Sequence, residues 1–594
     1  MKYGATPSAK GGVEFRISAP LVSTIEVRIN DAPPRKLERS GEDFEILLSD
    51  ARAGDKYKLV LDGSRERPDP WSRSQPDGVH RWSEIVDPAS FTWTDQSWTG
   101  LELTDFIFYE LHTGTFTPSG TFEGVASKLA YLKDLGVTAI ELMPVAEFPG
   151  ARNWGYDGVD LFAPHSAYGG PSGLKSLVNA AHSEGLAVVL DVVYNHLGPE
   201  GNYLAEFAPF FTERYRTPWG AAINFDGPGS DGVRRFFIDN AIYWLTEYHI
   251  DALRIDAIHG IFDFGARHFL AELRDHFHEE AQRLGRRAFL IAESDLNDVR
   301  VIQRSEKGGY ALDGQWHDEF HHTLVSMLTG ARRGFLGDFG RLGQIRKAIT
   351  EGFVYDGIYS NYRQRHFGSS SRDEPGERFV AFIQNHDQIA NTAQGARLSQ
   401  LVSREQYGMA VMVLLCSPFL PLLFMGEEFA DTAPFQYFTS HGDPSVAKAV
   451  SDGRRREHAD FASGGEFHDP QAVETFQVSR LRWEMVDRPG HSETLDLYKK
   501  VIALRKQWSC LGNCRKDLTR VCVDEDARFL RMERGDPSGC HAVLLCNFSE
   551  KPAAFTMESG ACALWTGTPP EDQNGGIIIG RESAALYLAK PSVR

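Results

Sequence analysis

The feature that most constrains the fold is a series of eight short apolar runs, separated from one another by segments with helical patterns. Short apolar runs are typical of buried parallel strands, and strands that alternate with helices are typical of βα units. The runs cover residues 106–109, 139–142, 187–193, 252–256, 289–293, 379–384 and 420–425, with a weak run near Gln315 and Trp316. Eight such repeats predict an α/β protein with a (β/α)8 TIM barrel, whose last helix we expect at residues 495–506.

The two ends of the chain follow a different pattern, in which apolar and polar residues alternate. Val13, Phe15 and Ile17 show this period of two, and it returns after the barrel at residues 529–531 and 542–548. Period-two alternation between turn residues is typical of strands in a β-sandwich. We therefore expect an immunoglobulin-like β-sandwich at residues 1–100, the barrel with inserted loops at 101–508, and a β-sandwich at 509–594.

Charge and targeting signals narrow the classes of partner. The formal net charge of -18 disfavours a polyanionic partner, so no nucleic acid is expected. The N-terminus lacks the apolar core of a signal peptide, and no apolar stretch reaches about 18 residues, which predicts no membrane partner and a cytoplasmic location. Six of the seven cysteines lie between Cys510 and Cys562 without zinc-type pairing, so we interpret them as structural or free thiols of open redox state. The sequence leaves the oligomeric state open.

Four ionisable residues lie at the ends of the apolar runs, where barrel active sites are built. Arg254 and Asp256 end one run, Glu293 ends the next, and Asp387 follows a third. The strand period of two places Arg254 and Asp256 on one face, so the guanidinium can keep the carboxylate ionised. Paired carboxyl groups in opposite protonation states are the equipment of glycoside hydrolysis. A lone aspartate at a strand end is more often a helix cap or ion-pair partner, but three such carboxyl groups together favour catalysis.

The segments that carry these residues resemble the four motifs of the α-amylase superfamily of glycoside hydrolases, family 13. They read DVVYNH at 191–196, LRIDAIH at 253–259, IAES at 291–294 and FIQNHD at 382–387. The resemblance implies that Asp256 is the nucleophile, Glu293 the general acid/base, and Asp387 a carboxylate that binds sugar hydroxyls. It also implies that three further residues line the same subsite, namely Arg254, His196 and His386.

Four other stretches are similar to the superfamily members that release trehalose from maltooligosyl trehalose, in trehalose biosynthesis. They are residues 109–116, 153–158, 217–226 and 432–444, of which the last separates these members best from glucan branching enzymes. The resemblance adds four substrate-binding residues, namely Tyr156, Asp157, Trp219 and His259. The expected partners are maltooligosyl trehalose and related α-glucans. Residues 198–232 form an unusually long loop, which we expect to fold over the leaving-group side of the cleft.

Several alternatives remain open at this stage. His196 and His386 could be hydrogen-bonded core histidines, and Tyr156 and Trp219 could be packing residues instead of platforms for sugar rings. The enzyme could be a glucan branching enzyme or an isoamylase-type debranching enzyme. The alternative that is not an enzyme is a glucan-binding scaffold protein. Asn195 resembles a calcium ligand of some amylases, but no full set of oxygen ligands surrounds it in the sequence, so no metal and no cofactor are expected.

Overall fold

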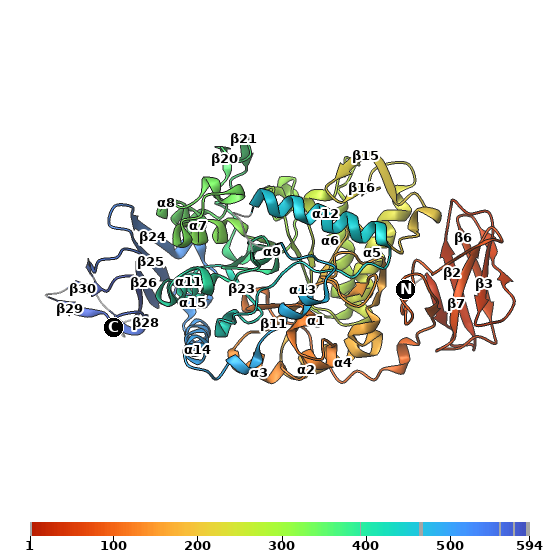
Figure 1. Ribbon diagram of the computed structural model, residues 1–594, viewed down its shortest axis with the longest axis horizontal. Coiled ribbons are helices and arrows are strands. Elements are labelled where there is room, and N and C mark those ends of the chain that lie inside the picture. The colour runs from red at the N-terminus through yellow and green to blue at the C-terminus, as the bar shows by residue number, and fades with distance from the viewer. Residues whose placement is uncertain (1–2, 393, 462–466, 557–559, 574–575, 590–594) are drawn as a thin grey trace.

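The computed structural model describes residues 3–392, 394–461, 467–556, 560–573 and 576–589, except for the side chains of 457–461. Three parts follow one another along the longest axis: a small β domain at the N-terminal end, a barrel in the centre, and a second β domain at the C-terminal end (Figure 1). No helix of the described residues combines the length and the apolar character needed to cross a membrane.

Eight parallel strands close into a barrel, as the apolar runs predict. Their order around the barrel is their order in the chain, β10-β11-β14-β17-β18-β19-β22-β23. The bounds are β10 Phe108–Leu111, β11 Ala139–Leu142, β14 Ala187–Val192, β17 Ala252–Ile255, β18 Phe289–Ala292, β19 Gly314–Trp316, β22 Phe379–Phe382 and β23 Leu420–Phe424. The (β/α)8 barrel is thereby confirmed, including the strand at the weak run near Gln315.

Helices that lie between the barrel strands or follow the last of them surround the barrel. They are α3 Leu129–Leu135, α4 Gly170–Ser183, α5 Ser230–Glu247, α6 Phe269–Leu284, α7 Asp318–Thr329, α8 Leu342–Glu351, α11 Arg404–Cys416 and α14 His491–Gln507. The last of them begins four residues before the predicted start at 495. Its first turn is polar and therefore lacks apolar periodicity, while the side chain of Glu493 accepts a hydrogen bond from the backbone N–H of Gly490.

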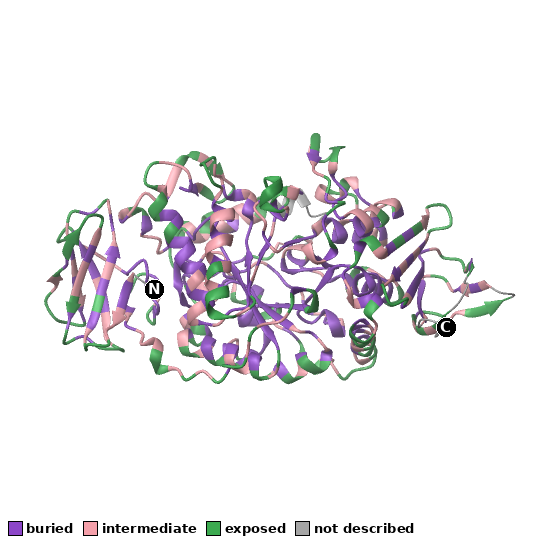
Figure 2. Cartoon of the chain, turned by 180° about the vertical axis from the view of Figure 1, so that it is seen from behind, coloured by how far each residue is buried: buried purple, intermediate pink, exposed green. Residues whose placement is uncertain are grey.

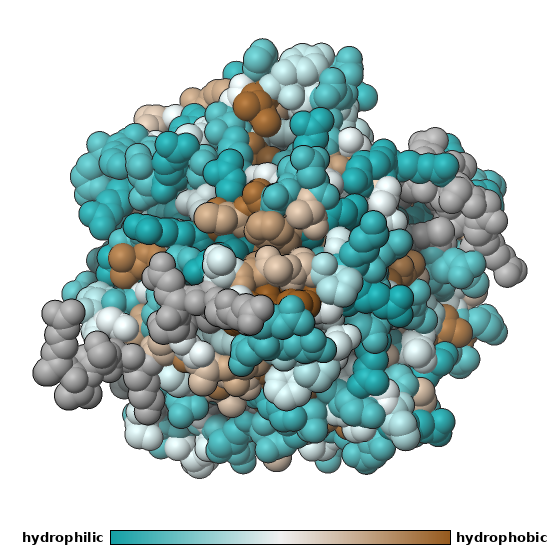
Figure 3. Space-filling model, turned by 90° about the vertical axis from the view of Figure 1, so that its left-hand side faces the viewer, coloured by the Kyte–Doolittle hydropathy of each residue, from teal (hydrophilic) through white to brown (hydrophobic). Residues whose placement is uncertain are grey.

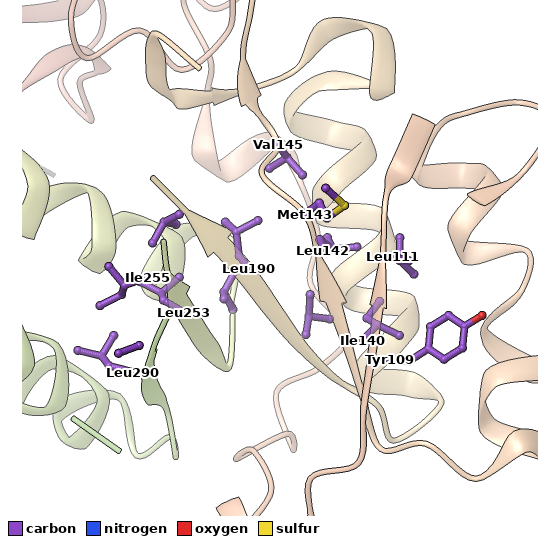
Figure 4. Close-up of a cluster of buried hydrophobic side chains, with 14 of the residues drawn as sticks. Tyr109, Leu111, Ile140, Leu142, Met143, Val145, Leu190, Leu253, Ile255 and Leu290 are labelled. Carbon is purple, nitrogen blue, oxygen red and sulfur yellow. The ribbon is translucent and has the colours of Figure 1, made fainter. Parts of the chain in front are cut away.

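The barrel strands bury both faces, but with different side chains. One face packs against the helices and is mainly apolar, with Gln315 as a buried polar exception; Figure 4 shows Leu111, Leu142 and Leu190 among its members. The other face points into the barrel, where an apolar layer contains Phe108, Ala139, Val189 and Ala252. The next inward positions along these strands, two residues further on, are occupied by Glu110, Glu141, Asp191 and Arg254, all buried. The carboxyl end of the barrel is thus charged, while its opposite end is apolar; Figure 2 shows how deeply the central strands are buried.

The N-terminal domain is built from two antiparallel sheets, with strand orders β1-β2-β6-β5 and β4-β3-β7-β8, and with β9 paired to β7. The bounds are β1 Gly4–Pro7, β2 Val13–Ser18, β3 Ile25–Ile29, β4 Arg35–Lys36, β5 Glu38–Ser40, β6 Asp43–Leu48, β7 Lys56–Leu61, β8 Arg65–Arg67 and β9 Ser83–Glu84. Buried residues alternate along β2 and β3, as a sandwich requires.

The C-terminal domain has a five-stranded sheet, β24-β25-β26-β31-β28, and a three-stranded sheet, β27-β30-β29. The bounds are β24 Thr519–Asp524, β25 Phe529–Gly535, β26 His541–Asn547, β27 Ala553–Thr556, β28 Ala561–Thr566, β29 Glu571–Gln573, β30 Gly576–Ile579 and β31 Ser583–Ala589. Seen from this end, hydrophilic side chains cover most of the face, with apolar atoms gathered near its centre (Figure 3). The division of the chain at residues 100 and 508 stays a prediction.

Three insertions lie along the same edge of the barrel, the upper edge in Figure 1. The first is a hairpin of β15 Phe211–Thr217 and β16 Gly220–Ile223, within residues 198–232. The second is a hairpin of β20 Asp356–Ser360 and β21 Arg365–Gly368, and the third is helix α12, Pro444–Phe461.

Candidate active site

Asp256 follows the last residue of β17 and is held through both carboxylate oxygens. Nη1 of Arg254 donates to Oδ1 of Asp256 at 2.8 Å, and Nδ2 of Asn195 donates to Oδ2 at 2.6 Å. The Arg254 side chain is 0% exposed, and its Nη1 also lies 2.8 Å from Oδ2 of Asp191. Charge-assisted hydrogen bonds of this kind favour the ionised carboxylate and restrict its orientation. The arrangement suits a nucleophile.

Glu293 follows β18, the neighbouring strand, and is prepared as a proton donor. Its Oε2 accepts a hydrogen bond of 2.5 Å from the backbone N–H of Ala257 and lies 3.6 Å from Nη2 of Arg254. The side chain is 12% exposed, and burial, reinforced by the negative charge of Asp256, raises the pKa of Glu293 although Arg254 acts in the opposite direction. A carboxyl group with a raised pKa keeps its proton to a higher pH than an ordinary glutamate, which suits a general acid.

The backbone between these two residues is unusual. Ala257, directly after Asp256, has a φ of 37°, in the left-handed region that residues with a Cβ rarely adopt. Strained backbone of this kind gathers at functional sites, where the surrounding structure holds it in place. Here it is the residue whose N–H binds Glu293.

Asp387 lies in the first turn of the short helix α9, His386–Ala390, directly after β22. The side chain of Asn385 begins this helix by accepting a hydrogen bond of 2.9 Å from the N–H of Gln388. The Asp387 side chain is 48% exposed, and its Oδ1 lies 3.6 Å from Nε2 of His386. An exposed carboxylate beside two more enclosed carboxyl groups is free to bind hydroxyl groups of a substrate.

A buried network connects His386 to the arginine under Asp256. Nδ1 of His386 lies 2.5 Å from Oε1 of Glu110, and its Nε2 lies 2.8 Å from the hydroxyl of Tyr156. The Tyr156 hydroxyl donates to Oδ2 of Asp191 at 2.6 Å, and Asp191 binds Arg254. Burial alone would lower the pKa of His386, but the carboxylates of Glu110 and Asp387 outweigh it and raise the pKa to about 9. His386 therefore carries a positive charge at neutral pH.

Asp191 is the second arginine-bound carboxyl group of this network. Burial raises the pKa of Asp191 to about 7, with Arg254 opposing the rise and Asp256 adding to it. Its protonation is thus sensitive to pH near neutrality, and its hydrogen bonds tie Tyr156 to Arg254.

Trp219 occupies the turn between β15 and β16 and forms an aromatic wall. Its ring stacks on the ring of His196, with centroids 4.7 Å apart and planes inclined by 12°, and the ring of His259 lies 6.2 Å away. The indole is 45% exposed. Nδ1 of His196 contacts Oδ1 of Asn195, and its Nε2 lies 3.1 Å from the backbone oxygen of Tyr156. Burial lowers the pKa of His196.

One cleft with a cavity volume of about 610 Å³ unites the residues that the sequence singles out. It is lined by Asp256, Glu293, Asp387, His196, His386, Tyr156, Asp157, Trp219 and His259. The tenth predicted site residue, Arg254, lies buried beneath the cleft and contacts it through Asp256. The structure therefore brings together all ten residues, whose individual roles stay predictions.

Several neighbours of this site could not be predicted, or were not predicted, from the sequence. Glu110 received no role, although a charged residue that directly follows an apolar strand run is itself a signal. Asp191 and Asn195 lie in the first motif, where Asn195 was considered only as a metal ligand. Arg454, which lines the cleft from α12, has no sequence signal because it belongs to an insertion far from every motif.

Comparisons with known proteins agree with the geometry. The family model of the α-amylase catalytic domain matches residues 70–217. A malto-oligosyltrehalose trehalohydrolase of Saccharolobus solfataricus is 47% identical over 503 residues, covering 84% of this chain and 86% of the relative. The one from Mycobacterium tuberculosis is 37% identical and covers 98% of this chain and 100% of its own. The crystal structure of an α-amylase candidate from Salmonella typhimurium matches with a TM-score of 0.91 at 37% identity, covering 99% of both chains.

Proposed function

Since this chain belongs to the family of the malto-oligosyltrehalose trehalohydrolases, barrel enzymes with an α-amylase catalytic domain, we propose that it releases trehalose from maltooligosyl trehalose. The enzyme is a glycoside hydrolase that cleaves the α-1,4 bond next to the trehalose end and leaves a shortened maltooligosaccharide. One observation carries this function: Asp256 and Glu293 line the same cleft and both lie against the guanidinium of Arg254. The similarity of the chain to the trehalohydrolases supports it.

The first half of the proposed reaction is a displacement at the anomeric carbon. A carboxylate oxygen of Asp256 attacks this carbon, and the bond from the carbon to the glycosidic oxygen breaks. Glu293 donates its proton to that oxygen, so trehalose leaves as a neutral alcohol and a covalent glycosyl-enzyme remains. The raised pKa of Glu293 supports its role as the acid, and the two hydrogen bonds on Asp256 support its role as the nucleophile.

The second half restores the enzyme. Glu293, now ionised, takes a proton from a water molecule while the oxygen of that water attacks the anomeric carbon. The bond from this carbon to Asp256 breaks. Asp256 is again a carboxylate and Glu293 again carries a proton. Two inversions retain the anomeric configuration, and such retention is expected for carboxyl groups about 5–5.5 Å apart.

The remaining residues are proposed to bind the sugar at the scissile bond. Asp387 accepts hydrogen bonds from its hydroxyl groups, and the charged His386 lies beside it. Tyr156 presents an aromatic ring to the sugar, whose apolar faces stack on such rings. His196, Trp219 and His259 form the aromatic wall described above, and Asp157 adds a carboxylate at its edge.

We propose that the reaction needs no metal ion, because Asn195 is already committed to protein contacts. Its Nδ2 donates to the backbone oxygen of Asp256 at 2.7 Å and to Oδ2 at 2.6 Å, and its Oδ1 contacts His196. We also propose a cytoplasmic location and no nucleic-acid partner, which the unpaired cysteines and the net charge of -18 support.

Product analysis tests this function against the alternatives. Wild-type protein is incubated with maltooligosyl trehalose, with amylose and with a branched glucan, and products are separated by thin-layer chromatography. We expect trehalose from the first substrate, and Glu293→Gln serves as the inactive control. New α-1,6 linkages in amylose would indicate a branching enzyme, release of chains from the branched glucan a debranching enzyme, and binding without products a scaffold. Proton NMR of the fresh maltooligosaccharide should show the α-anomer.

A further inference from the structure

A second carboxylate centre lies outside the catalytic cluster, at Glu200 in the long segment 198–232. Its Oε2 lies 3.2 Å from Nδ1 of His441 and accepts a hydrogen bond of 3.0 Å from the N–H of Gly442. Its Oε1 accepts one of 3.1 Å from the N–H of Asp443. Glu200 is only 8% exposed, so these partners replace water around a buried charge. One side chain thus binds three consecutive residues of a loop that follows the last barrel strand.

The loop 441–443 is connected to the cleft by two sets of contacts, which we call the first and the second route. The first runs through His441, whose ring is wholly buried. Its Nε2 lies 3.7 Å from Oδ2 of Asp157, a cleft residue that also accepts a hydrogen bond of 2.6 Å from Nδ2 of Asn153. Glu200 and Asp157 therefore face the two nitrogens of one imidazole, and the anchored ring packs against Asp157.

The second route runs through helix α12. Oδ1 of Asp443 accepts hydrogen bonds from the N–H groups of Ser445, at 2.7 Å, and Val446, at 3.3 Å, and so caps the helix at its start. Two to three turns later α12 contributes Arg454 to the wall of the cleft. Nη2 of Arg454 donates at 2.9 Å to the backbone oxygen of Ala390, the last residue of the helix that carries Asp387.

We propose that Glu200 is a positioning residue for substrate binding, which anchors the loop 441–443 and thereby holds Asp157 and α12 against the cleft. Within the described residues, none of its hydrogen bonds reaches Asp256, Glu293 or Asp387. The proton transfers and the nucleophilic attack therefore remain as they are when Glu200 is changed. The affinity of such a variant for the glucan chain falls, because Asp157 and α12 lose their common anchor and the bound substrate must then order them.

Glu206 offers a matched control in the same segment. Its carboxylate oxygens each lie 2.8 Å from an arginine, one from Nη1 of Arg65 and the other from Nε of Arg67, and both arginines belong to the N-terminal domain. Glu206→Gln removes a comparable set of charge-assisted hydrogen bonds without touching the loop 441–443. Any general effect of lost ion pairs in this segment appears in both variants.

The test compares Glu200→Ala, Glu200→Gln and Glu206→Gln with wild type on maltooligosyl trehalose, and it rests on the proposed function for its kinetic readout. We expect both Glu200 variants to raise KM at least about tenfold while kcat stays within about threefold, and Glu206→Gln to leave both parameters within about twofold. A merely structural role would lower the active fraction, and with it kcat, without this rise in KM. An unchanged KM in a folded Glu200 variant, or an equal rise in Glu206→Gln, would overturn the inference.

Two further measurements keep the outcome decisive. If Glu200→Ala does not fold, Asp443→Ala removes the cap of α12 alone and should itself raise KM several-fold. A normal KM in Asp443→Ala contradicts the route through α12.

If wild type releases no trehalose, the proposed function fails, and calorimetric titration with maltohexaose tests the inference separately. In that titration Glu200→Gln should bind at least about tenfold more weakly than Glu206→Gln, and equal binding would refute it.

Discussion

Nη1 of Arg254 lies 2.8 Å from Oδ1 of Asp256, and the arginine has no exposed surface at all. Arg254 lies on the inward face of β17, and Asp256 directly follows the last residue of that strand. The matching inward positions of β10, β11 and β14 carry the buried carboxyl groups of Glu110, Glu141 and Asp191. A buried guanidinium needs carboxylate partners, and Asp191, Asp256 and Glu293 all lie within ion-pair distance of it. Arg254 thus organises the charges on which the following predictions depend.

Asp256→Asn and Glu293→Gln should each reduce kcat by about 100- to 10,000-fold, because each removes a group that acts only in the chemical steps. Both replacements keep the shape of the side chain, so the fold and the glucan affinity should stay largely intact. Steady-state kinetics, calorimetric binding and thermal unfolding measure the three quantities. A variant that retains more than roughly a tenth of wild-type kcat would contradict the role assigned to that residue.

Activity should follow a bell-shaped function of pH. On the acid side it falls as the nucleophile Asp256 becomes protonated, and on the alkaline side it falls as Glu293 loses the proton that it must donate. Burial raises the pKa of Glu293, so the alkaline limb should lie above the ordinary range of a glutamate. The measurement is kcat/KM from pH 4 to pH 9; a flat profile over this range rules out the assignment of acid and nucleophile.

Trp219→Ala should lower kcat/KM for maltooligosyl trehalose more than for a maltooligosaccharide of equal length. We expect the exposed indole, held by its stack on His196, to lie against a glucose ring of the trehalose unit, which only the first substrate offers. A stacked ring is worth about 0.5–1.5 kcal/mol, so the loss of kcat/KM on maltooligosyl trehalose should be roughly two- to twelvefold larger than the loss on the maltooligosaccharide. Trp219→Phe is the matched control and should restore most of it. Equal losses on both substrates would show that Trp219 supports the cleft in general.

Glu110→Gln should make the protein less stable near pH 6 and have a smaller effect above pH 9. Folding raises the pKa of His386 from 6.5 to about 9, so its charge stabilises the folded state fully below pH 6.5, and this contribution is lost as pH rises through about 9. With about 1.4 kcal/mol for each pKa unit, the contribution is up to about 3 kcal/mol. Denaturant unfolding at pH 6 and pH 10 measures it. Glu206→Gln, which leaves His386 untouched, should show no such pH dependence; an equal dependence in both variants would count against the Glu110–His386 pair.

The sequence by itself determined the barrel and the catalytic end of its strands. Eight apolar runs predict eight buried strands, and the period of two places Arg254 and Asp256 on the inward face, because successive side chains of a strand point to opposite sides. The same local rule extends to Glu293 on the neighbouring strand. Ten site residues could therefore be named from the motifs, and all ten meet at one cleft.

Only the tertiary structure decided which residues support that cleft. The pairs Glu110 with His386, His196 with Trp219, and Glu200 with His441 join residues from separate elements or loops, and no periodicity within either partner's segment points to the other. The helix α12 is polar along much of its length and lies in an insertion, so its sequence contains no sign of the wall it forms. Such contacts depend on the closure of the whole barrel, which brings loops from different strands to one edge, and a local pattern cannot report that closure.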